Sequence, residues 1–326
     1  MLTAFTCKAG HPVRLTDTAD NAALASAVWI DLRDPTPEES AHVAMATGLH
    51  VPTQAEVSEI ETSSRLSRRG GALYLSLPMV TMADGPRGAS AGFVLSPQRL
   101  ITVRFAPSKV FETFAETMPR GDMAGDSGGQ ILIALLEAIV DRQADVLEGV
   151  QTELDTISHD VFSLGGHNEA GRKNEDRMLR DTLARLGRIA DLLSHIRESQ
   201  LGVSRLLPYI ASHTTEWLPA DLAARLRTLK SDIDSVGEFD NHLTNKLQFM
   251  LDATMGFINI AQNDVMKVMT VASVVGIPPV LVAGIYGMNF KNIPEYDWAW
   301  GYPYGLALIM VTALIPLAIF RWRKWI

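Results

Sequence analysis

Two long apolar stretches in the C-terminal part of the chain restrict its fold more than any other feature. Neither Val268 to Tyr286 nor Tyr302 to Phe320 contains a charged residue, and each is nineteen residues long. Because a helix rises about 1.5 Å per residue, each stretch approaches the length that a hydrocarbon core of about 30 Å requires. We therefore predict two transmembrane helices, joined by the segment from Asn289 to Gly301, in a membrane-embedded protein.

The charges around the two spans indicate their orientation. Four basic residues lie on the side away from the connecting segment: Lys267, Arg321, Arg323 and Lys324. The connecting segment carries one basic residue, Lys291, and two acidic residues, Glu295 and Asp297. Since basic residues concentrate on the cytoplasmic side, and since no secretory-signal pattern is visible at the N-terminus, we expect both termini to lie in the cytoplasm.

Composition and short motifs argue against several classes of protein. A formal net charge of −8 disfavours a nucleic-acid partner, because phosphate binding needs concentrated lysine and arginine. Cys7 is the only cysteine, which excludes an internal disulfide. The sequence has no P-loop, no His-Glu-x-x-His and no Cys-x-x-Cys, so an ATP-driven pump or a zinc enzyme is not expected.

The segment Gly125-Asp126-Ser127-Gly128-Gly129 reproduces the surroundings of the nucleophile in chymotrypsin-like serine proteases. That fold needs two β-barrels that carry a partner His and Asp. Here the segment leads directly into an amphipathic helix, so we expect Asp126 or Ser127 to be the N-cap of that helix.

Residues 1–127 have the mixed pattern of an α/β domain. Short β-rich runs at Val28 to Leu32, Ala72 to Leu77 and Leu100 to Phe105 are separated by Pro, Gly and Asp signals. Thr36 followed by Pro37 predicts the start of a helix.

Residues 128–262 form a helical part. Apolar residues recur with a period of about 3.6 from Gln130 up to Gly165 and Gly166, and again from Met178 to a stop near Pro208. These two helices are expected to pack on the α/β domain as an antiparallel pair.

A third helix after Pro219 carries a heptad seam, in which apolar residues alternate spacings of four and three. The seam consists of Leu222, Leu226, Leu229, Ile233, Val236, Leu243, Leu247, Met250 and Phe257, interrupted by Asp240, Thr254 and Ala261. No stop signal separates this seam from the first span, so one helix of about 65 residues is predicted to enter the membrane domain at 263–326. The seam indicates self-association around an axis.

The end of the first span resembles the CorA family of magnesium and cobalt transporters. The resemblance rests on Tyr286-Gly287-Met288-Asn289-Phe290, followed by Pro294-Glu295, Trp298, Trp300 and Gly301-Tyr302-Pro303. The segments Ala55 to Met79, Leu95 to Phe105 and Asn263 to Ile326 are similar to the family, in its bacterial ZntB-like branch.

This resemblance implies an α+β membrane protein of the bacterial inner membrane, with a cytoplasmic α/β/α domain, a stalk helix, a pentameric assembly and a pore lined by the first span. It implies transport of hydrated divalent cations, Mg²⁺ first and Co²⁺ or Ni²⁺ besides, and neither an enzyme nor a resident cofactor. A ring of Asn289 side chains, with the carbonyls of Gly287 and Met288, would form the outer selectivity site. The alternative is that Gly287 and Asn289 only end a helix, since both tolerate left-handed conformations.

One face of the first span matches the pore-lining positions of the family. Its members are Asn263, Met266, Met269, Ser273, Ile277, Val280 and Gly284. Met266 and Met269 are expected to form a constriction that blocks ions by dewetting, with Asn263 as a polar ring beside it. The alternative is ordinary helix packing, and the family has a polar residue more often than Val at position 280.

Acidic residues supply candidate regulatory and attracting groups. Asp252 matches an acidic position in the cytoplasmic pore of the family. Regulatory Mg²⁺ ligands are predicted on the stalk at Asp232, Asp234, Glu238 and Asp240, although such residues are often only a solvated face. Glu295 and Asp297 in the external loop would attract cations.

Two further functions stay open. One is a zinc transporter of the ZntB type, coupled to protons, for which Met288 is the less usual residue. The other is a scaffold anchored by the two spans, although polar Asn263 and Asn289 bring no advantage to a plain anchor.

Overall fold

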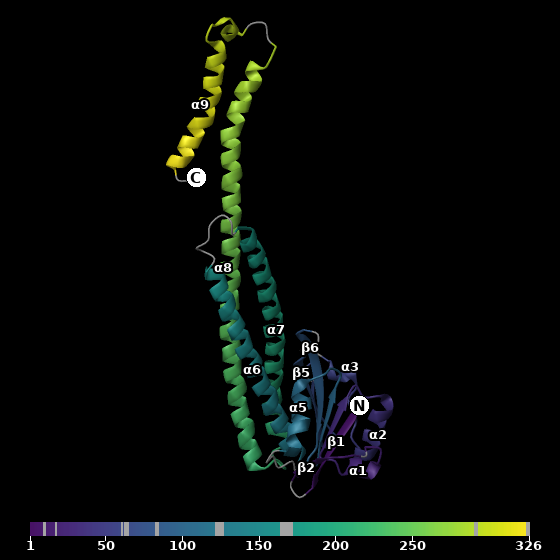
Figure 1. Cartoon of the computed structure of the whole chain (residues 1–326). Coiled ribbons are helices and arrows are strands. Elements are labelled where there is room, and N and C mark those ends of the chain that lie inside the picture. The colour runs from purple at the N-terminus through teal and green to yellow at the C-terminus, as the bar shows by residue number, and fades with distance from the viewer. Residues whose placement is uncertain are drawn as a thin grey trace. The chain divides into compact units, whose positions relative to one another are not determined.

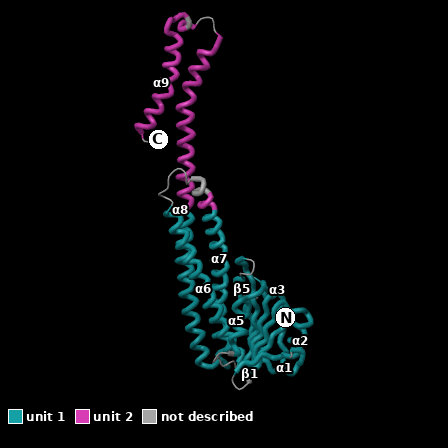
Figure 2. Tube along the Cα trace, viewed as in Figure 1, with its two compact units in different colours: residues 1–166, 181–251 teal, residues 167–180, 252–326 magenta. Residues whose placement is uncertain are grey.

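The computed structural model describes residues 1–8, 11–16, 18–59, 61, 65–81, 85–120, 127–163, 172–289 and 293–323. It divides into two compact units (Figure 2). Unit 1 comprises residues 1–166 and 181–251, and unit 2 comprises residues 167–180 and 252–326.

Unit 1 is built on a seven-stranded sheet with the order β2-β1-β3-β7-β6-β5-β4 (Figure 1). The strands are β1 (Leu2–Lys8), β2 (His11–Arg14), β3 (Trp29–Arg33), β4 (Leu66–Arg69), β5 (Ala72–Thr81), β6 (Arg87–Leu95) and β7 (Leu100–Arg104). Only β3 and β7 pair in parallel, and all other neighbours are antiparallel. The three strands expected from the sequence are confirmed as β3, β5 and β7.

Helices cover both faces of this sheet, as an α/β/α domain requires. Short helices lie on one face: α1 (Asn21–Ala25), α2 (Pro37–Thr47) and α3 (Gln54–Val57). Longer helices lie on the other: α5 (Lys109–Thr117) and those parts of α6 (Gly128–Ser163), α7 (Arg172–His213) and α8 (Ala220–Tyr286) that contribute to the core on this face, with a 3₁₀ turn η1 (Met118–Arg120). Alternation along the strands separates the two cores, since Trp29 faces α5 and α6 whereas Ile30 faces the short helices.

Two helix starts follow the capping rules that the sequence indicates. Thr36 caps α2 through a capping box with Glu39, and Pro37 is the first helical residue. The hydroxyl of Ser127 accepts a hydrogen bond from the N–H of Gln130 at 3.3 Å. A Cβ on Gly128 would lie 2.3 Å from the backbone carbon of Arg99, so glycine allows α6 to approach the turn between β6 and β7. Ser127 is therefore confirmed as a cap, while Asp126 lies outside the described residues.

The expected end of the second long helix at Pro208 is wrong, because α7 continues through Pro208 to His213. Leu207 and Ile210 on either side of the proline are buried in the core. Their burial outweighs the cost of a proline inside a helix, which is about 3 kcal/mol.

The heptad seam of α8 is also corrected. Six of its first seven apolar residues, all except Val236, are at most 5% exposed within the single chain. The first four belong to the core beneath the sheet: Leu222, Leu226, Leu229 and Ile233. The seam from Leu222 to Met250 therefore packs against the chain's own helices and not against another copy. The predicted continuous helix is confirmed, since α8 spans 67 residues and runs through both units.

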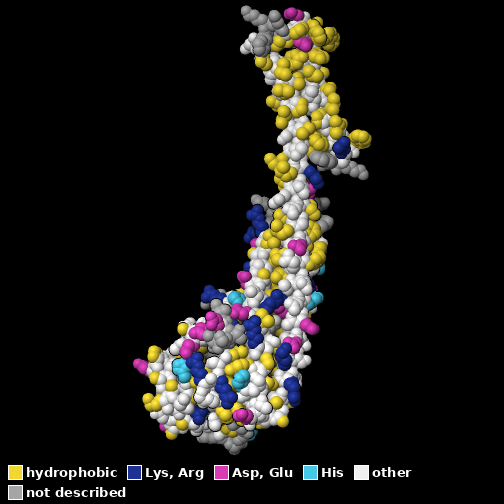
Figure 3. Space-filling view, turned by 180° about the vertical axis from the view of Figure 1, so that it is seen from behind, with side chains coloured by type: hydrophobic (Ala, Val, Ile, Leu, Met, Phe, Trp, Pro, Cys, Tyr) yellow, Lys and Arg dark blue, Asp and Glu magenta, His cyan; other side chains and the backbone are white. Residues whose placement is uncertain are grey.

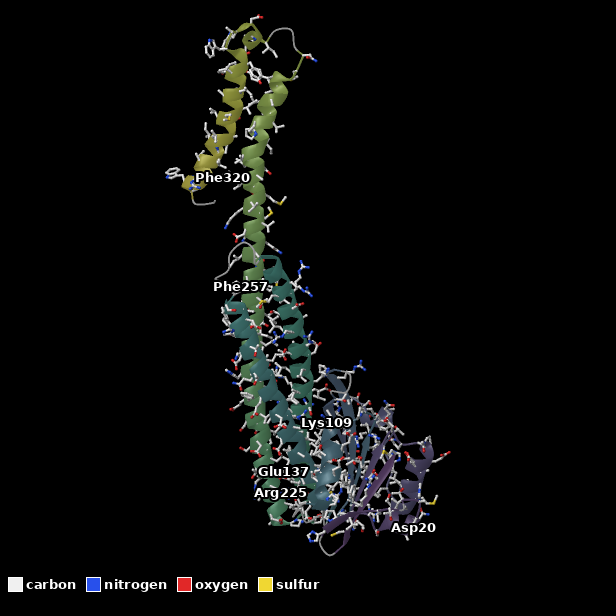
Figure 4. All side chains as sticks on the ribbon, viewed as in Figure 1. Asp20, Lys109, Glu137, Arg225, Phe257 and Phe320 are labelled. Carbon is white, nitrogen blue, oxygen red and sulfur yellow. The ribbon has the colours of Figure 1, made fainter. Side chains whose placement is uncertain are left out.

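Ion pairs fasten α8 to the neighbouring helices of unit 1. Arg225 of α8 binds Glu137 of α6 through two hydrogen bonds, of 3.0 and 2.5 Å (Figure 4). The hydrogen bonds that Arg225 donates to Glu137 raise the pKa of Arg225. Asp240 of α8 is 1% exposed and accepts a hydrogen bond from Nε of Arg197 in α7 at 2.9 Å, and Nη2 of Arg197 forms an ion pair with it at 2.7 Å. Asp240 thus breaks the apolar seam because α7 supplies its partner.

We predict that Arg197→Met destabilises unit 1 by about 3 kcal/mol, because it leaves a buried carboxylate without its cation. Burial raises the pKa of Asp240 and the hydrogen bond from Arg197 opposes that rise, so the pKa climbs further in the variant. As pH falls through this raised pKa, Asp240 becomes protonated, and the free-energy cost of burying an unpaired carboxylate is removed. In thermal melting, the loss of stability of Arg197→Met relative to the unsubstituted protein should become smaller from neutral to mildly acidic pH. The control Arg188→Met, at an exposed position, should change stability by less than about 0.5 kcal/mol.

Unit 2 contains the two helices expected to span a membrane. They are the C-terminal part of α8 and α9 (Gly301–Trp322), connected through the 3₁₀ turn η4 (Pro294–Asp297). Both helices are long and apolar enough to cross a bilayer, and their most apolar windows are not buried inside the chain. Hydrophobic side chains cover most of the surface of these helices (Figure 3).

Candidate functional site

The C-terminal part of α8 has two distinct faces within unit 2. Val271, Val275, Pro279, Val282 and Tyr286 are only half exposed, and α9 runs beside this part of α8 (Figure 1). In α9, the half-exposed positions also follow helical spacing, at Gly305, Leu308, Ile309, Thr312, Ala313, Pro316 and Phe320. The two helices therefore turn matching stripes toward each other.

The opposite face of α8 is the one predicted to line a pore. At about 100° per residue it lies roughly half a turn from the stripe that faces α9. All seven of its members are exposed in the single chain: Asn263, Met266, Met269, Ser273, Ile277, Val280 and Gly284. Met266, Met269, Ile277 and Val280 are between 61% and 71% exposed. This stripe is thus free to meet another surface, a lipid or an ion path.

The Gly-Met-Asn triplet lies directly after the last residue of α8. The N–H of Gly287 donates to the carbonyl of Ala283 at 2.9 Å, and that of Met288 to Ile285 at 3.2 Å. Gly287, Met288 and Asn289 are all exposed. Neither Gly287 nor Asn289 has a positive φ, so no left-handed cap forms here, although α8 does end at Tyr286, directly before the triplet. The amide of Asn289 is left at the helix end as a neutral oxygen dipole.

The connecting segment is held close to the start of α9. A Cβ on Gly301 would lie 2.0 Å from the carbonyl oxygen of Glu295, so this contact requires glycine. Trp298 and Tyr304 meet edge to face with ring centroids 5.9 Å apart. Asp297 is exposed and Glu295 is half exposed on η4, while Lys291 lies outside the described residues.

The acidic residues of α8 have different surroundings. Asp232, Glu238 and Asp252 are exposed, Asp234 pairs with Lys230, and Asp240 is the buried partner of Arg197. In the described part of the chain, no group of three or more His, Cys, Asp or Glu side chains is arranged to hold a metal ion.

Sequence reasoning missed an acidic stripe on α6 that faces Asp232. Glu137, Asp141 and Asp145 recur every four residues, and this spacing is the signal that was available. Burial, followed by the charges of Glu137, Asp145 and Asp232, raises the pKa of Asp141. Glu137 is neutralised by Arg225 and Asp145 lies 3.7 Å from Arg142, so much of this charge is balanced within the chain.

The arrangement in unit 2 fits passage of an ion better than catalysis. One stripe of α8 carries Asn263 and Ser273 between apolar residues, and Asn289 follows just beyond the end of α8. Neutral oxygen dipoles can hold an ion that keeps most of its water. A single α-helix cannot enclose such a path, so several copies would have to surround it.

Comparison with known proteins agrees with this geometry. Residues 25–323 match the model of a family described as CorA-like Mg²⁺ transporter protein. A Haemophilus ducreyi protein named Magnesium transport protein CorA is 30% identical over the full length of both chains. The complete structure of the CorA magnesium transporter from Methanocaldococcus jannaschii has a TM-score of 0.73 at 19% identity, covering 100% of this chain and 99% of that one. The full-length CmaX protein has a TM-score of 0.68 at 18% identity, with 100% and 98% covered.

Proposed function

The chain belongs to the CorA family of Mg²⁺ transporter proteins, and on this basis we propose that it carries hydrated Mg²⁺ across a membrane through a pore built by several copies of itself. The observation that supports this most is the stripe of α8 from Asn263 to Gly284, whose members are all exposed in the single chain. Membership of a transporter family also agrees with the expectation that the chain is not an enzyme.

The pore requires a closed ring, and we propose a homopentamer. The stripe that faces α9 is already partly covered, so the opposite stripe of each copy is available to face the axis. Asn289 side chains with the carbonyls of Gly287 and Met288 form the selectivity site at the outer mouth. Met266 and Met269 form an apolar constriction at the other end, beside the polar ring of Asn263.

Mg²⁺ is the proposed cargo, with Co²⁺ or Ni²⁺ as further substrates. Mg²⁺ gives up its water reluctantly, and the amide of Asn289 offers dipoles without a tight charged cage. The full-length relative from Haemophilus ducreyi is named for magnesium transport. Zn²⁺ transport coupled to protons is the alternative.

We place the spans in the bacterial inner membrane with both termini in the cytoplasm. Lys267, Arg321 and Arg323 then lie on the cytoplasmic side, where basic residues concentrate. Exposed Trp298, Trp300 and Tyr302 lie at the opposite end of α9, at the depth where aromatic residues favour a membrane interface.

We assign regulation by internal Mg²⁺ to acidic residues shared between copies. Asp232, Glu238 and Asp252 are exposed and suit this role. Asp234 and Asp240 already have Lys230 and Arg197 as partners, so they would take part only by giving up those ion pairs.

Uptake into liposomes tests the proposal. Purified protein is reconstituted, and entry of Mg²⁺ and Zn²⁺ is followed with ion-selective dyes, with a pH gradient in half of the runs. We expect Mg²⁺ entry that does not depend on the pH gradient. Zn²⁺ entry that follows the proton gradient would move the protein to the zinc alternative. No flux of either ion from an assembled oligomer would favour the scaffold.

Removing the external carboxylates should slow uptake without abolishing it. In Glu295→Gln with Asp297→Asn, we expect Mg²⁺ entry at subsaturating concentration to fall about threefold, because the two charges raise the local cation concentration. The effect should shrink as ionic strength rises from about 0.01 M to about 1 M, since the Debye length falls from about 30 Å to about 3 Å. An equal loss at both ionic strengths would contradict electrostatic attraction.

A further inference from the structure

The α/β layer of unit 1 contains a second polar site, far along the chain from the transport stripe. It lies at the carboxyl ends of β3 and β7, the parallel pair of the sheet. On the face toward α5, these strands are apolar at their start, with Trp29 and Leu100, and charged at their end, with Arg33 and Arg104. The carboxyl ends of parallel strands are where α/β folds commonly bind ligands.

A hydrogen-bonded chain of side chains leads to this end of the sheet. The indole N–H of Trp29 donates to Thr102 Oγ1 at 3.0 Å, and Thr102 donates to Asp31 Oδ1 at 2.8 Å. Arg104 donates from Nη2 to Asp31 Oδ2 at 2.9 Å. The side chains of Arg104 and Asp31 are only 7% and 6% exposed. A buried ion pair seldom stabilises a fold more than apolar residues would, which points to a role beyond stability.

The positions of Arg33 and Arg104 are not those that the stability of the fold alone would favour. Arg33 and Arg104 are register partners on adjacent strands, where like charges repel each other. Nη1 of Arg104 is buried without a hydrogen-bond partner, and Glu112 Oε1 is 3.8 Å away. The ring of Phe111, 5.2 Å from the guanidinium carbon, helps to fix Arg104 in place. Buried donors are nearly always satisfied, so this one calls for a partner.

An open cavity of about 430 Å³ lies over these residues. Its charged lining comprises Arg104 and Asp31 from the sheet, Arg33 and Arg14 from the ends of β3 and β2, the N-terminal residue Met1, and Glu112 and Glu116 from α5. Arg33 donates from Nη1 to Glu112 at 3.2 Å and from Nη2 to the sulfur of Met1 at 3.0 Å. A guanidinium carries more N–H groups than these two hydrogen bonds use, so others remain available to a ligand. Among the described residues, the side chain of Arg14 has no hydrogen-bond or ion-pair partner.

We propose that this cavity binds a small oxyanion, such as a phosphate ester or a short polycarboxylate. Arg33 and Arg14 bind the oxygen atoms at the rim, because a guanidinium matches a phosphate or carboxylate with two parallel hydrogen bonds. Arg104, held by Asp31 and Phe111, offers the unpartnered N–H groups of its Nη1 beneath them. The volume accommodates a molecule of the size of a nucleoside monophosphate.

Calorimetric titration of the full-length protein in detergent tests the site, using inorganic phosphate, AMP and citrate as probes and chloride at equal ionic strength as the reference. We expect saturable binding of at least one probe. Arg33→Gln should weaken it by about tenfold to a hundredfold, the loss of a charged hydrogen-bond pair. Arg14→Gln, on an edge strand, provides a second variant, and Arg68→Gln on β4 at the other edge of the sheet is the control.

Binding that is weakened in Arg33→Gln or Arg14→Gln and retained in Arg68→Gln supports the site. The pattern among phosphate, AMP and citrate then distinguishes phosphate esters from polycarboxylates. No saturable binding of any probe, an effect that chloride reproduces, or equal affinity in all variants would overturn it. The titration measures no transport, so its outcome is independent of the proposed function.

Discussion

Asn289→Ala is expected to abolish Mg²⁺ uptake while leaving the oligomer intact. Asn289 is exposed just beyond α8, so its side chain contributes little to the fold of its own chain. In the ring it would supply one neutral amide per copy to the hydrated ion. If each copy loses about 1 kcal/mol of interaction with the ion, the losses of all copies together should lower the rate of Mg²⁺ uptake by more than about a hundredfold.

The control for this variant is Asn21→Ala, an exposed asparagine in the first turn of α1. It should retain normal uptake. Initial rates of Mg²⁺ entry into liposomes, with the oligomer checked by size-exclusion chromatography, are the measurement. Normal uptake by Asn289→Ala would remove the triplet from the selectivity site.

Gly284→Phe is expected to block Mg²⁺ transport as completely as Asn289→Ala, but by steric obstruction of the path. A Cβ at Gly284 meets no atom of the chain within 4 Å, so a single chain tolerates a larger side chain there. In a closed ring every copy would place a phenyl ring in the narrow path. Uptake should fall by more than about a hundredfold, while helix stability rises slightly because Gly is a poor helix former.

Ala307→Phe is the matched control, because Ala307 is exposed on α9 about half a turn from the residues that face α8. A lipid-facing phenylalanine should leave uptake unchanged. If Ala307→Phe blocked transport and Gly284→Phe did not, α9 and not α8 would line the path.

The stripe of α8 illustrates what a sequence can predict. Spacing of three and four, together with the length of the apolar segment, identified the long helix, and the Gly-Met-Asn triplet at its end indicated the family. These signals are local, because a helix repeats its faces at fixed intervals. The same pattern also identified the seam from Leu222 to Met250 as a covered face, but the expected self-association there was wrong.

The partner of that buried face could not be read from periodicity. A heptad pattern shows that one side of a helix is covered, but a second copy and the chain's own helices cover it equally well. Asp240 is the informative position, since its partner Arg197 comes from a helix 43 residues earlier in the chain. Only the three-dimensional arrangement shows that this seam belongs to unit 1.

Long-range contacts also explain the remaining errors. Pro208 is a helix breaker by local rules, but Leu207 and Ile210 are buried beside it. The charged end of β3 and β7 gave no sequence signal, because Arg33 and Arg104 meet only through parallel pairing of strands about 70 residues apart.

Accessibility of single cysteines on α8 tests the central claim most directly. Cys7 is the only cysteine, so Cys7→Ser provides a cysteine-free background. Ser273→Cys and Val280→Cys are then compared with Ala307→Cys and Leu314→Cys on α9, all at exposed positions. Mg²⁺ uptake is measured before and after treatment with a charged thiol reagent that does not enter lipid. We expect the reagent to block uptake through the two α8 variants and to leave the two α9 variants unaffected. Uptake unaffected at both α8 positions, or blocked at the α9 positions, would contradict a pore lined by this face of α8.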